Sequence, residues 1–265
     1  MFLEKITPSG SNGLKNLDPD DLKAAVMETG CVQMNGFIYT DHELSELVKS
    51  VAPGVKRGVV AAETGLLMHG ELYWTPYPPD ILWFICITPP EVGGETLLVD
   101  GIEIATNLSK RTFDYFCKNP LIYERHMSRE VWQRQFRCET VKDVKMRVAP
   151  YCNCLITEDT NESIILHLSH YAIRHTKWGG EPAFVNSLLH ALDSKKNKDL
   201  VNYGLCNNVP EDCVSEVQKL VSELQSPIIW SEGDIVVIDN TRMMHGRNPF
   251  SGKREINAIN GIAAF

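Results

Sequence analysis

Two short segments that lie far apart in this chain contain residue types that act together in metal sites, and this pairing constrains the fold more than any other feature. The first segment is His69, Gly70 and Glu71, and the second contains His245. The two histidines are 176 positions apart (245 − 69 = 176). The two segments are predicted to form the two halves of one site.

The residue spacing in the first segment favours an extended strand. Side chains alternate between the two faces of a strand, so His69 and Glu71 point the same way, and Gly70 adds no side chain that could obstruct them. On a helix, side chains two positions apart would diverge. Two imidazoles and one carboxylate on one face of Fe(II) leave three coordination positions open for a co-substrate and dioxygen. The pattern therefore predicts oxidation chemistry with His69, Glu71 and His245 as metal ligands.

An isolated His-x-Glu is usually an ordinary surface pair. The sequence around it therefore determines whether His69 and Glu71 are interpreted as metal ligands. A proline-rich turn, an apolar run over 81–87 and a Gly-Gly turn before 96–100 predict one antiparallel unit. Near the other end, the segments 227–230, 235–240 and 243–247 repeat the pattern of strand, turn and strand. Both halves of the predicted site thus lie among β-type segments.

Taken together, these stretches resemble the taurine dioxygenase and TfdA-like branch of the Fe(II)- and 2-oxoglutarate-dependent oxygenases. The shared motifs are a His-x-(Asp/Glu) followed by a Tyr and a Pro-Pro turn, a Gly-Gly-x-Thr, and a distal Gly-Asp, Asp-Asn and His-Gly-Arg with a following arginine. The resemblance runs in order over roughly residues 20 to 260. Each motif is weak alone, and the set in this order is specific.

The resemblance implies a role for each motif residue. His69, Glu71 and His245 would bind Fe(II). Arg254, nine positions after the distal histidine (254 − 245 = 9), corresponds to the arginine that receives the far carboxylate of 2-oxoglutarate. A planar guanidinium meets a carboxylate through two parallel hydrogen bonds. Thr96 corresponds to the threonine that helps to hold this co-substrate, and the expected reaction consumes O₂ and releases succinate and CO₂.

Two departures from better-known members bear on the substrate. The carboxylate is Glu71 rather than aspartate, as in asparagine oxygenase-like members, which favours a free amino acid or an amino-acid-derived metabolite. A second arginine that binds the substrate's acid group in several members is replaced by Ala258. Arg247 is then the main candidate for substrate binding, and further candidates are Arg242, Arg57, Asn257 and Asn260.

The sequence indicates the family more specifically than it indicates which oxidation reaction the enzyme catalyses. Related halogenases carry alanine or glycine in place of the carboxylate, so Glu71 makes hydroxylation of an unactivated C–H bond the default. Desaturation, epoxidation and cyclisation stay open. A zinc-dependent hydrolase or lyase is disfavoured because His-Glu-x-x-His is absent and Arg254 and Thr96 are present. A catalytically inactive ligand-binding protein is disfavoured because the ligand positions are intact.

The resemblance implies mixed α/β structure dominated by β, a double-stranded β-helix, which is a jelly-roll barrel with flanking helices. The metal ligands would lie at one open end of the barrel. The 265 residues, 43% of them hydrophobic, can bury one sizeable core. We expect a single domain over 1–265 with an insert between the two halves of the barrel at about 104–180.

The resemblance implies a small-molecule substrate, and charge and composition support neither a nucleic-acid partner nor a membrane. The net charge of −8 gives no support for nucleic-acid binding. No apolar stretch approaches the roughly 18 residues that span a membrane, and the start lacks a signal-peptide pattern, which predicts a cytoplasmic enzyme. The eight cysteines are scattered without a Cys-x-x-Cys pair, which indicates reduced thiols. A homo-oligomer stays open, because small family members often form dimers or tetramers.

Local patterns predict several further elements. Helices are expected at 18–30, 41–51, 104–118 and 209–224, and strands at 31–37, 146–148 and 163–168. The arginines of 124–137, which include Arg125, are typical of a solvated face or of local ion pairs, and the corresponding region of related enzymes often forms a lid. His167 and His170 have a spacing that could bind zinc on a helix, but the β-branched residues before them favour a strand, so they are interpreted as ordinary histidines, like His190.

Overall fold

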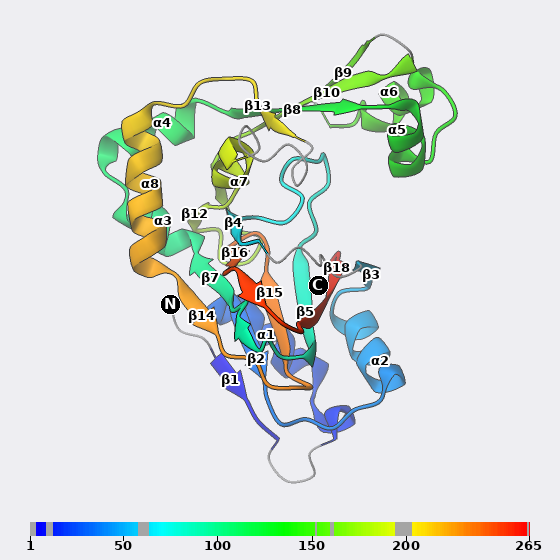
Figure 1. The fold of residues 1–265 in the computed structure, drawn as a ribbon, viewed down its shortest axis with the longest axis vertical. Helices are drawn as coiled ribbons and strands as arrows, with labels where there is room; N and C mark the ends of the chain where they lie inside the picture. The colour runs from blue at the N-terminus through cyan, green and yellow to red at the C-terminus, as the bar shows by residue number, and fades with distance from the viewer. Residues whose placement is uncertain are drawn as a thin grey trace.

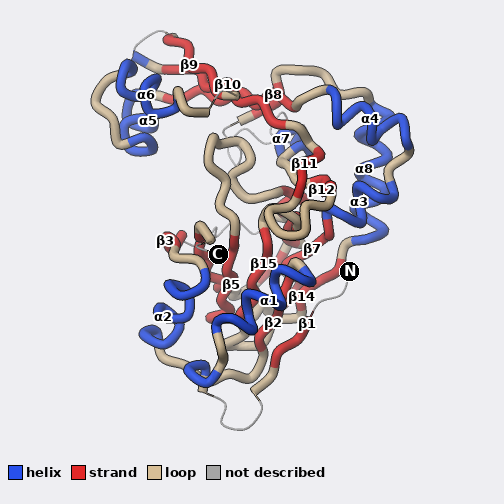
Figure 2. The backbone as a smooth tube through the Cα atoms, turned by 180° about the vertical axis from the view of Figure 1, so that it is seen from behind, coloured by secondary structure: helices blue, strands red, loops and turns tan. Residues whose placement is uncertain are grey.

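The computed structural model describes residues 4–8, 13–57, 64–151, 153–159, 162–193, 203–263 and 265. Within these ranges, strands form two main sheets, a separate four-stranded sheet and two short pairs. Helices flank the main sheets (Figures 1 and 2). The predicted mixed and strand-rich fold class is confirmed. The described strands do not join into a closed barrel.

The larger main sheet has six strands in the order β1-β2-β15-β5-β18-β3. Only β1 and β2 run parallel, and the other neighbours are antiparallel. The helices α1 and α2 pack on its outer face, and Figure 2 shows α1 crossing in front of the strands. The bounds are β1 (Glu4–Ile6), β2 (Cys31–Met34), β15 (Ile235–Asp239), β5 (Ile81–Thr88), β18 (Glu255–Gly261), β3 (Gly54–Arg57), α1 (Pro19–Thr29) and α2 (Asp41–Val51), with a short 3₁₀ helix at Leu14–Asn16.

The smaller main sheet has four antiparallel strands in the order β14-β7-β16-β4. Helices α3, α4, α7 and α8 all contribute buried side chains to the apolar cluster on its outer side. The bounds are β14 (Ser226–Ile228), β7 (Thr96–Asp100), β16 (Met243–Arg247), β4 (Leu66–His69), α3 (Gly101–Asn107), α4 (Lys110–Lys118), α7 (Leu188–Asp193) and α8 (Glu211–Leu224). A short pair, β6 (Val92–Gly93) with β17 (Phe250–Ser251), lies at one end.

The two main sheets share a core, which explains the continuous apolar runs in the sequence. Leu82 and Phe84 of β5 pack in the same cluster as Leu98 of β7, so this cluster lies between the sheets. Trp83 and Ile85 alternate with them and pack toward α1 and α2 instead. Because both faces of β5 are covered, its sequence shows no alternation of polar and apolar residues.

The prediction that 81–87 and 96–100 form one antiparallel unit is wrong. The strand β5 pairs with β15 and β18 in the larger sheet, whereas β7 pairs with β14 and β16 in the smaller one. Gly93 and Gly94 between them adopt positive φ values of 68° and 72°. A Cβ on Gly93 would lie 2.3 Å from the carbonyl oxygen of Pro249, so only glycine allows this close turn from one sheet to the other.

A separate sheet with the order β13-β8-β10-β9 projects from the main body (Figure 1). The helices α5 and α6 cover one of its faces around a small apolar cluster that includes Trp132, Val144 and Ile164. The bounds are β13 (Gly204–Leu205), β8 (Leu121–Met127), β10 (Ile164–His170), β9 (Cys154–Glu158), α5 (Arg129–Phe136) and α6 (Val141–Val148), and β11 (Ile173–His175) pairs nearby with β12 (Pro182–Phe184). The expected insert at about 104–180 stays a prediction.

Most of the predicted helices are confirmed, and one predicted strand is wrong. Asp18 caps α1, and Thr40 with Glu43 forms a complete capping box at α2. Residues 146–148 lie in α6 instead of a strand, because Thr140 and Asp143 form a second capping box there. Among the residues that the structure describes, no helix has the length and apolar character that a membrane crossing requires.

Candidate metal centre

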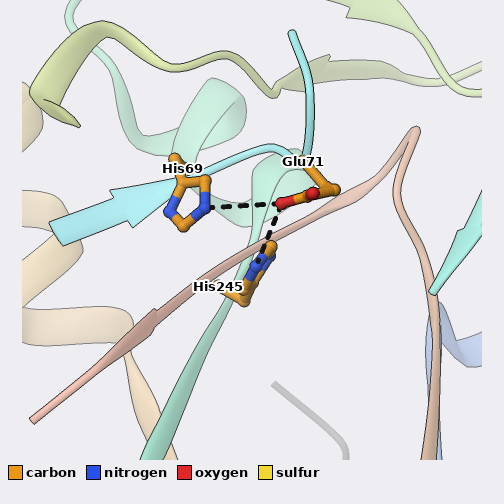
Figure 3. Close-up of side chains that lie close together, drawn as sticks. All are labelled: His69, Glu71 and His245. Carbon is orange, nitrogen blue, oxygen red and sulfur yellow. Dashed lines mark ion pairs between the residues drawn. The ribbon is translucent and has the colours of Figure 1, made fainter. Parts of the chain in front are cut away.

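The three predicted metal ligands meet at one end of the smaller sheet. His69 ends β4, and His245 lies opposite it in the antiparallel pair of β4 and β16. Their ring centroids are 4.3 Å apart. One ligand atom from each of His69, Glu71 and His245 lies within 4.8 Å of the others, and the three side chains converge (Figure 3).

Glu71 does not lie on the strand as predicted, because β4 ends at His69 and the chain turns. Asn240 fixes this turn: its Oδ1 accepts a hydrogen bond from the backbone N of Glu71 at 2.8 Å, and its Nδ2 donates to the Glu71 carbonyl at 3.1 Å. A Cβ on Gly70 would lie 2.6 Å from the Tyr73 ring. The absence of a side chain at Gly70 is therefore required by packing within this turn.

The hydrogen bonds orient the histidines for metal binding. Nδ1 of His69 donates to the Leu67 carbonyl at 2.8 Å, which leaves Nε2 with a free lone pair. This Nε2 lies 3.7 Å from Oε2 of Glu71, and Nε2 of His245 lies 3.9 Å from the same oxygen. Both distances exceed ordinary hydrogen-bond length, and the two ring nitrogens and the carboxylate oxygen face one another. Two nitrogens and one oxygen in this arrangement fit Fe(II).

The site also favours the charge states that metal ligands need. Burial raises the pKa of Glu71, but the two imidazoles and the Asn260 amide outweigh it and bring the pKa to about 2. The amide Nδ2 of Asn260 donates to Oε1 of Glu71 at 3.1 Å. Burial, with repulsion from His69, lowers the pKa of His245 to about 3. At neutral pH the Glu71 carboxylate is thus ionised and the His245 imidazole is neutral, as metal binding requires.

A row of aromatic rings in contact with one another extends from His69 toward the separate sheet. The ring of His190 lies 4.8 Å from that of His69, and its Nδ1 is 2.8 Å from the Tyr203 hydroxyl. Tyr203 stacks on Trp74 at 4.9 Å. The interpretation of His190 as an ordinary histidine missed this contact. No local sequence motif marks it, because the contact depends on α7 packing against β4.

Arg125 lies at the end of this row and is not on a solvated face as predicted. Its side chain points to the inner face of β8, the residue is only 6% exposed, and its guanidinium lies 4.4 Å from the Trp74 ring centroid. Its Nη1 donates to Oε1 of Gln135. No carboxylate of the described ranges pairs with it, and its Nε makes no hydrogen bond. Burial lowers its pKa to about 10.

The two residues predicted to hold 2-oxoglutarate also meet. Nη2 of Arg254 donates to the Thr96 hydroxyl at 3.3 Å, and Nε donates to the Gly94 carbonyl at 2.8 Å. Arg247 lies opposite Thr96 in the pair of β16 and β7, and its Nη2 donates to the Thr64 carbonyl at 2.8 Å. Burial and the nearby charge of Arg247 lower the pKa of Arg254 to about 10. Two guanidinium groups thus lie near each other at this end of the site.

The other substrate-binding candidates lie elsewhere. Arg242 forms an ion pair with Asp100 at 2.6 Å and donates to the Glu28 carbonyl, so it ties the sheet to α1. Asn260 contacts the ligand carboxylate, as described above. Asn257 is buried in β18. The side chain of Arg57 lies outside the described residues.

This geometry is that of mononuclear non-haem iron oxygenases, which hold the metal by two histidines and one carboxylate. Residues 12–259 match the family model described as taurine catabolism dioxygenase TauD, TfdA family. The chain belongs to this family, and it is an Fe(II)- and 2-oxoglutarate-dependent dioxygenase. The predicted family and enzyme class are confirmed.

Known proteins agree with this assignment. The dapdiamide synthesis protein DdaC of Enterobacter agglomerans is 23% identical over 86% of this chain and 81% of its own. The crystal structure of AAD-2 in complex with Mn(II) and N-oxalylglycine matches with a TM-score of 0.64 at 13% identity, over 99% of this chain and 94% of that one. PvcB, described as an Fe, alpha-ketoglutarate dependent oxygenase from an isonitrile synthetic pathway, matches with a TM-score of 0.63 at 12% identity, over 98% and 85%. At these identities, the likeness to the two solved structures is one of fold.

Proposed function

We propose that this enzyme hydroxylates an unactivated C–H bond of a small substrate that carries a carboxylate, such as a free amino acid or an amino-acid-derived metabolite. The observation that carries this proposal is the buried guanidinium of Arg125, which pairs with no carboxylate of the described residues. An uncompensated buried charge costs free energy. A substrate carboxylate supplies the missing partner through two parallel hydrogen bonds.

The contacts of Arg125 connect it to the metal ligands. Its guanidinium lies on Trp74, which follows the ligand Glu71 by three positions, and Trp74 stacks on Tyr203. Tyr203 contacts His190 beside His69. A substrate held by its acid group at Arg125 would place its other end along these rings toward the metal. This anchor replaces the arginine that is missing at Ala258.

In this proposal, His69, Glu71 and His245 hold Fe(II), while Arg254 and Thr96 hold the far carboxylate of 2-oxoglutarate. The bound iron supplies O₂ activation coupled to oxidative decarboxylation of 2-oxoglutarate to succinate and CO₂. Arg247 adds positive charge beside Thr96, and we assign it to attracting the acid groups that bind there. The protein contributes geometry. It holds the target carbon of the substrate near the metal, and it holds the substrate's acid group and the far carboxylate of 2-oxoglutarate away from the metal.

The test begins with anaerobically purified protein, Fe(II) and 2-oxoglutarate, to which each common amino acid is added in turn while succinate is measured. One amino acid should raise succinate release well above that of the inactive His245→Ala variant. Arg125→Gln should then raise KM for that amino acid far more than it lowers kcat. Arg129→Gln is the matched control, because Arg129 lies on the exposed side of α5.

Two results would count against the proposal. If no amino acid raises succinate above the His245→Ala background, the amino-acid substrate class is wrong. If a substrate is found and Arg125→Gln leaves its KM unchanged, the anchor is wrong. The mass of the product separates hydroxylation, which adds one oxygen atom, from desaturation or cyclisation, which remove two hydrogen atoms. Epoxidation of an alkene also adds one oxygen atom, so the NMR spectrum of the product separates it from hydroxylation.

We also propose that the two main sheets are the two halves of a double-stranded β-helix. The shared core between the sheets and the fold likeness to AAD-2 and PvcB support this proposal. The single-domain organisation with an insert at about 104–180, the cytoplasmic location, the absence of a nucleic-acid partner and self-assembly stay predictions from the sequence.

A further inference from the structure

A second group of metal-binding side chains lies on the separate sheet, outside the site described above. One ligand atom from each of Glu124, His167 and Cys206 lies within 4.8 Å of the others, the same proximity that the iron ligands show. Glu124 precedes Arg125 on β8 and therefore points to the opposite face of the sheet. The cluster is thus separate from the row of rings that leads to His69.

The strand register explains why these residues meet. Glu124 lies opposite His167 in the antiparallel pair of β8 and β10. On the other side of β8, Gly204 of β13 lies opposite Glu124, and the backbone N of Cys206 donates to the Ile122 carbonyl at 3.0 Å. Residues two positions apart on a strand share a face, so all three ligand-bearing side chains point to the same side.

The contacts within the cluster centre on one carboxylate. Oε2 of Glu124 lies 3.0 Å from Nε2 of His167, and Oε1 lies 3.1 Å from Nε2 of His126. Nδ1 of His167 is buried and has no hydrogen-bond partner in the described chain. Cys206 is a free and exposed thiol. The cluster is therefore open to solvent and holds a histidine whose hydrogen-bonding capacity is only partly used.

We propose that Glu124, His167 and Cys206 bind Zn²⁺, and that the exposed side chain of His126, which contacts Glu124 but lies outside the group of three, turns to supply the fourth ligand. A set of thiolate, imidazole and carboxylate donors is typical of four-coordinate zinc. The thiolate distinguishes this set from the nitrogen and oxygen donors of the iron site, since sulfur ligands favour zinc over the harder cations. On binding, the Cys206 thiol releases its proton to solvent.

The zinc ion would connect Cys206, which follows β13, to the central strands β8 and β10 of the separate sheet. Cys206 follows Tyr203 by three positions, and the Tyr203 hydroxyl contacts His190 beside the iron ligand His69. Binding at Cys206 therefore stabilises the position of Tyr203 in the row of rings. The site is structural, and its occupancy affects the active centre through this short segment.

The proposal is tested with Co²⁺ as a spectroscopic probe on chelator-treated full-length protein. A thiolate bound to Co²⁺ gives a charge-transfer absorption in the near ultraviolet, and the iron site contains no sulfur that could produce it. The band should reach its maximum by two equivalents of Co²⁺, because the iron site takes up one of them without contributing to the band. It should disappear on addition of excess Zn²⁺ and be absent in Cys206→Ser. Cys117→Ser is the matched control, because Cys117 is another exposed cysteine outside the cluster.

His167→Asn provides a second variant that keeps the thiol and a polar side chain on the same face. It should weaken Co²⁺ binding by at least about tenfold, because ligand number sets the affinity of such sites. Circular dichroism verifies that each variant is folded. If wild-type protein shows no thiolate band, or if the band persists in Cys206→Ser or is unchanged in His167→Asn, the proposal is wrong.

Discussion

His245 lies directly opposite His69 in the pair of β16 and β4, with ring centroids 4.3 Å apart, although 176 positions separate them in the chain (245 − 69 = 176). The two imidazoles are thus fixed by the same backbone ladder that holds the smaller sheet together. The third ligand differs, because Glu71 lies in a turn whose position depends on side-chain hydrogen bonds. The carboxylate is therefore the ligand most easily displaced by a change outside the metal site.

Asn240→Ala should weaken iron binding while leaving both histidines in place. The Asn240 amide contacts the backbone of Glu71 on both sides and also donates to the Pro79 carbonyl at 2.8 Å. Loss of a residue that orients a ligand typically costs 10- to 100-fold, so we expect a fall of about that size in Fe(II) affinity. The measurement is a titration of the apoprotein with Fe(II) in the presence of 2-oxoglutarate, under anaerobic conditions.

Asn248→Ala is the control for this variant, since Asn248 donates to Glu95 rather than to the ligand turn. Its iron affinity should equal that of the wild type. A lower melting temperature of Asn240→Ala with unchanged iron affinity would show that the asparagine supports only the fold.

Gly70→Ala tests the packing of the same turn. The added Cβ would lie 2.6 Å from the Tyr73 ring and 2.9 Å from Val185, so these buried side chains or the backbone have to move. Overpacking of this kind costs about 1–3 kcal/mol of unfolding free energy. Urea unfolding of the metal-free protein measures it, and Gly13→Ala, where the nearest atoms lie at 3.5 Å or more, is the control with room for the methyl group. Equal stability of the two variants would contradict the tight packing at Gly70.

Arg254→Lys should raise KM for 2-oxoglutarate. Lysine keeps the charge but loses the planar fork that meets a carboxylate with two hydrogen bonds. A hydrogen bond to a charged group contributes about 1.5–3 kcal/mol, so the increase in KM should be at least about tenfold. The measurement is succinate release against 2-oxoglutarate concentration. Lys253→Ala changes an exposed neighbour and should leave KM unaltered, and a similar KM for Arg254→Lys and wild type would remove Arg254 from co-substrate binding.

The sequence was a good guide where a motif or a cap determines local structure. The capping residues Thr40 and Asp18 mark helix starts that the structure confirms. The family motifs correctly brought His69 and His245 together. Their spacing could not show that β4 ends before Glu71, because the end of the strand depends on Asn240, which lies 169 positions later (240 − 71 = 169).

The errors in the middle of the chain have a related cause. Arg125 is flanked by polar residues, so its local sequence indicates exposure, whereas its burial depends on Trp74 from another part of the fold. In the same way, only the register of β8 against β10 brings Glu124 and His167 together. Residues 146–148 are apolar enough for a strand, and the cap at Thr140 that makes them helical lies outside that short window.

The buried carboxyl of Asp239 should make the stability of the protein depend on pH. Burial raises its pKa to about 6, although hydrogen bonds from Thr241 and the charge of Arg242 oppose the shift. The pKa in the unfolded chain is near the ordinary value of about 3.9. Between these values the folded state holds the extra proton, so ionisation of Asp239 reduces stability as pH rises from about 4 through 6. Below pH 4 the carboxyl is protonated in both states and the penalty is absent.

Asp239→Asn removes this ionisation while its side-chain oxygen can still accept the two Thr241 hydrogen bonds at 2.7 Å. Two pKa units correspond to about 3 kcal/mol, so the variant should be more stable than wild type by up to that amount at pH 8 and equal to it near pH 4. Urea unfolding across this pH range measures the difference. A variant that is less stable than wild type at pH 8 would show instead that the Asp239 carboxylate stabilises the fold through Arg242, whose charge then outweighs the cost of burial.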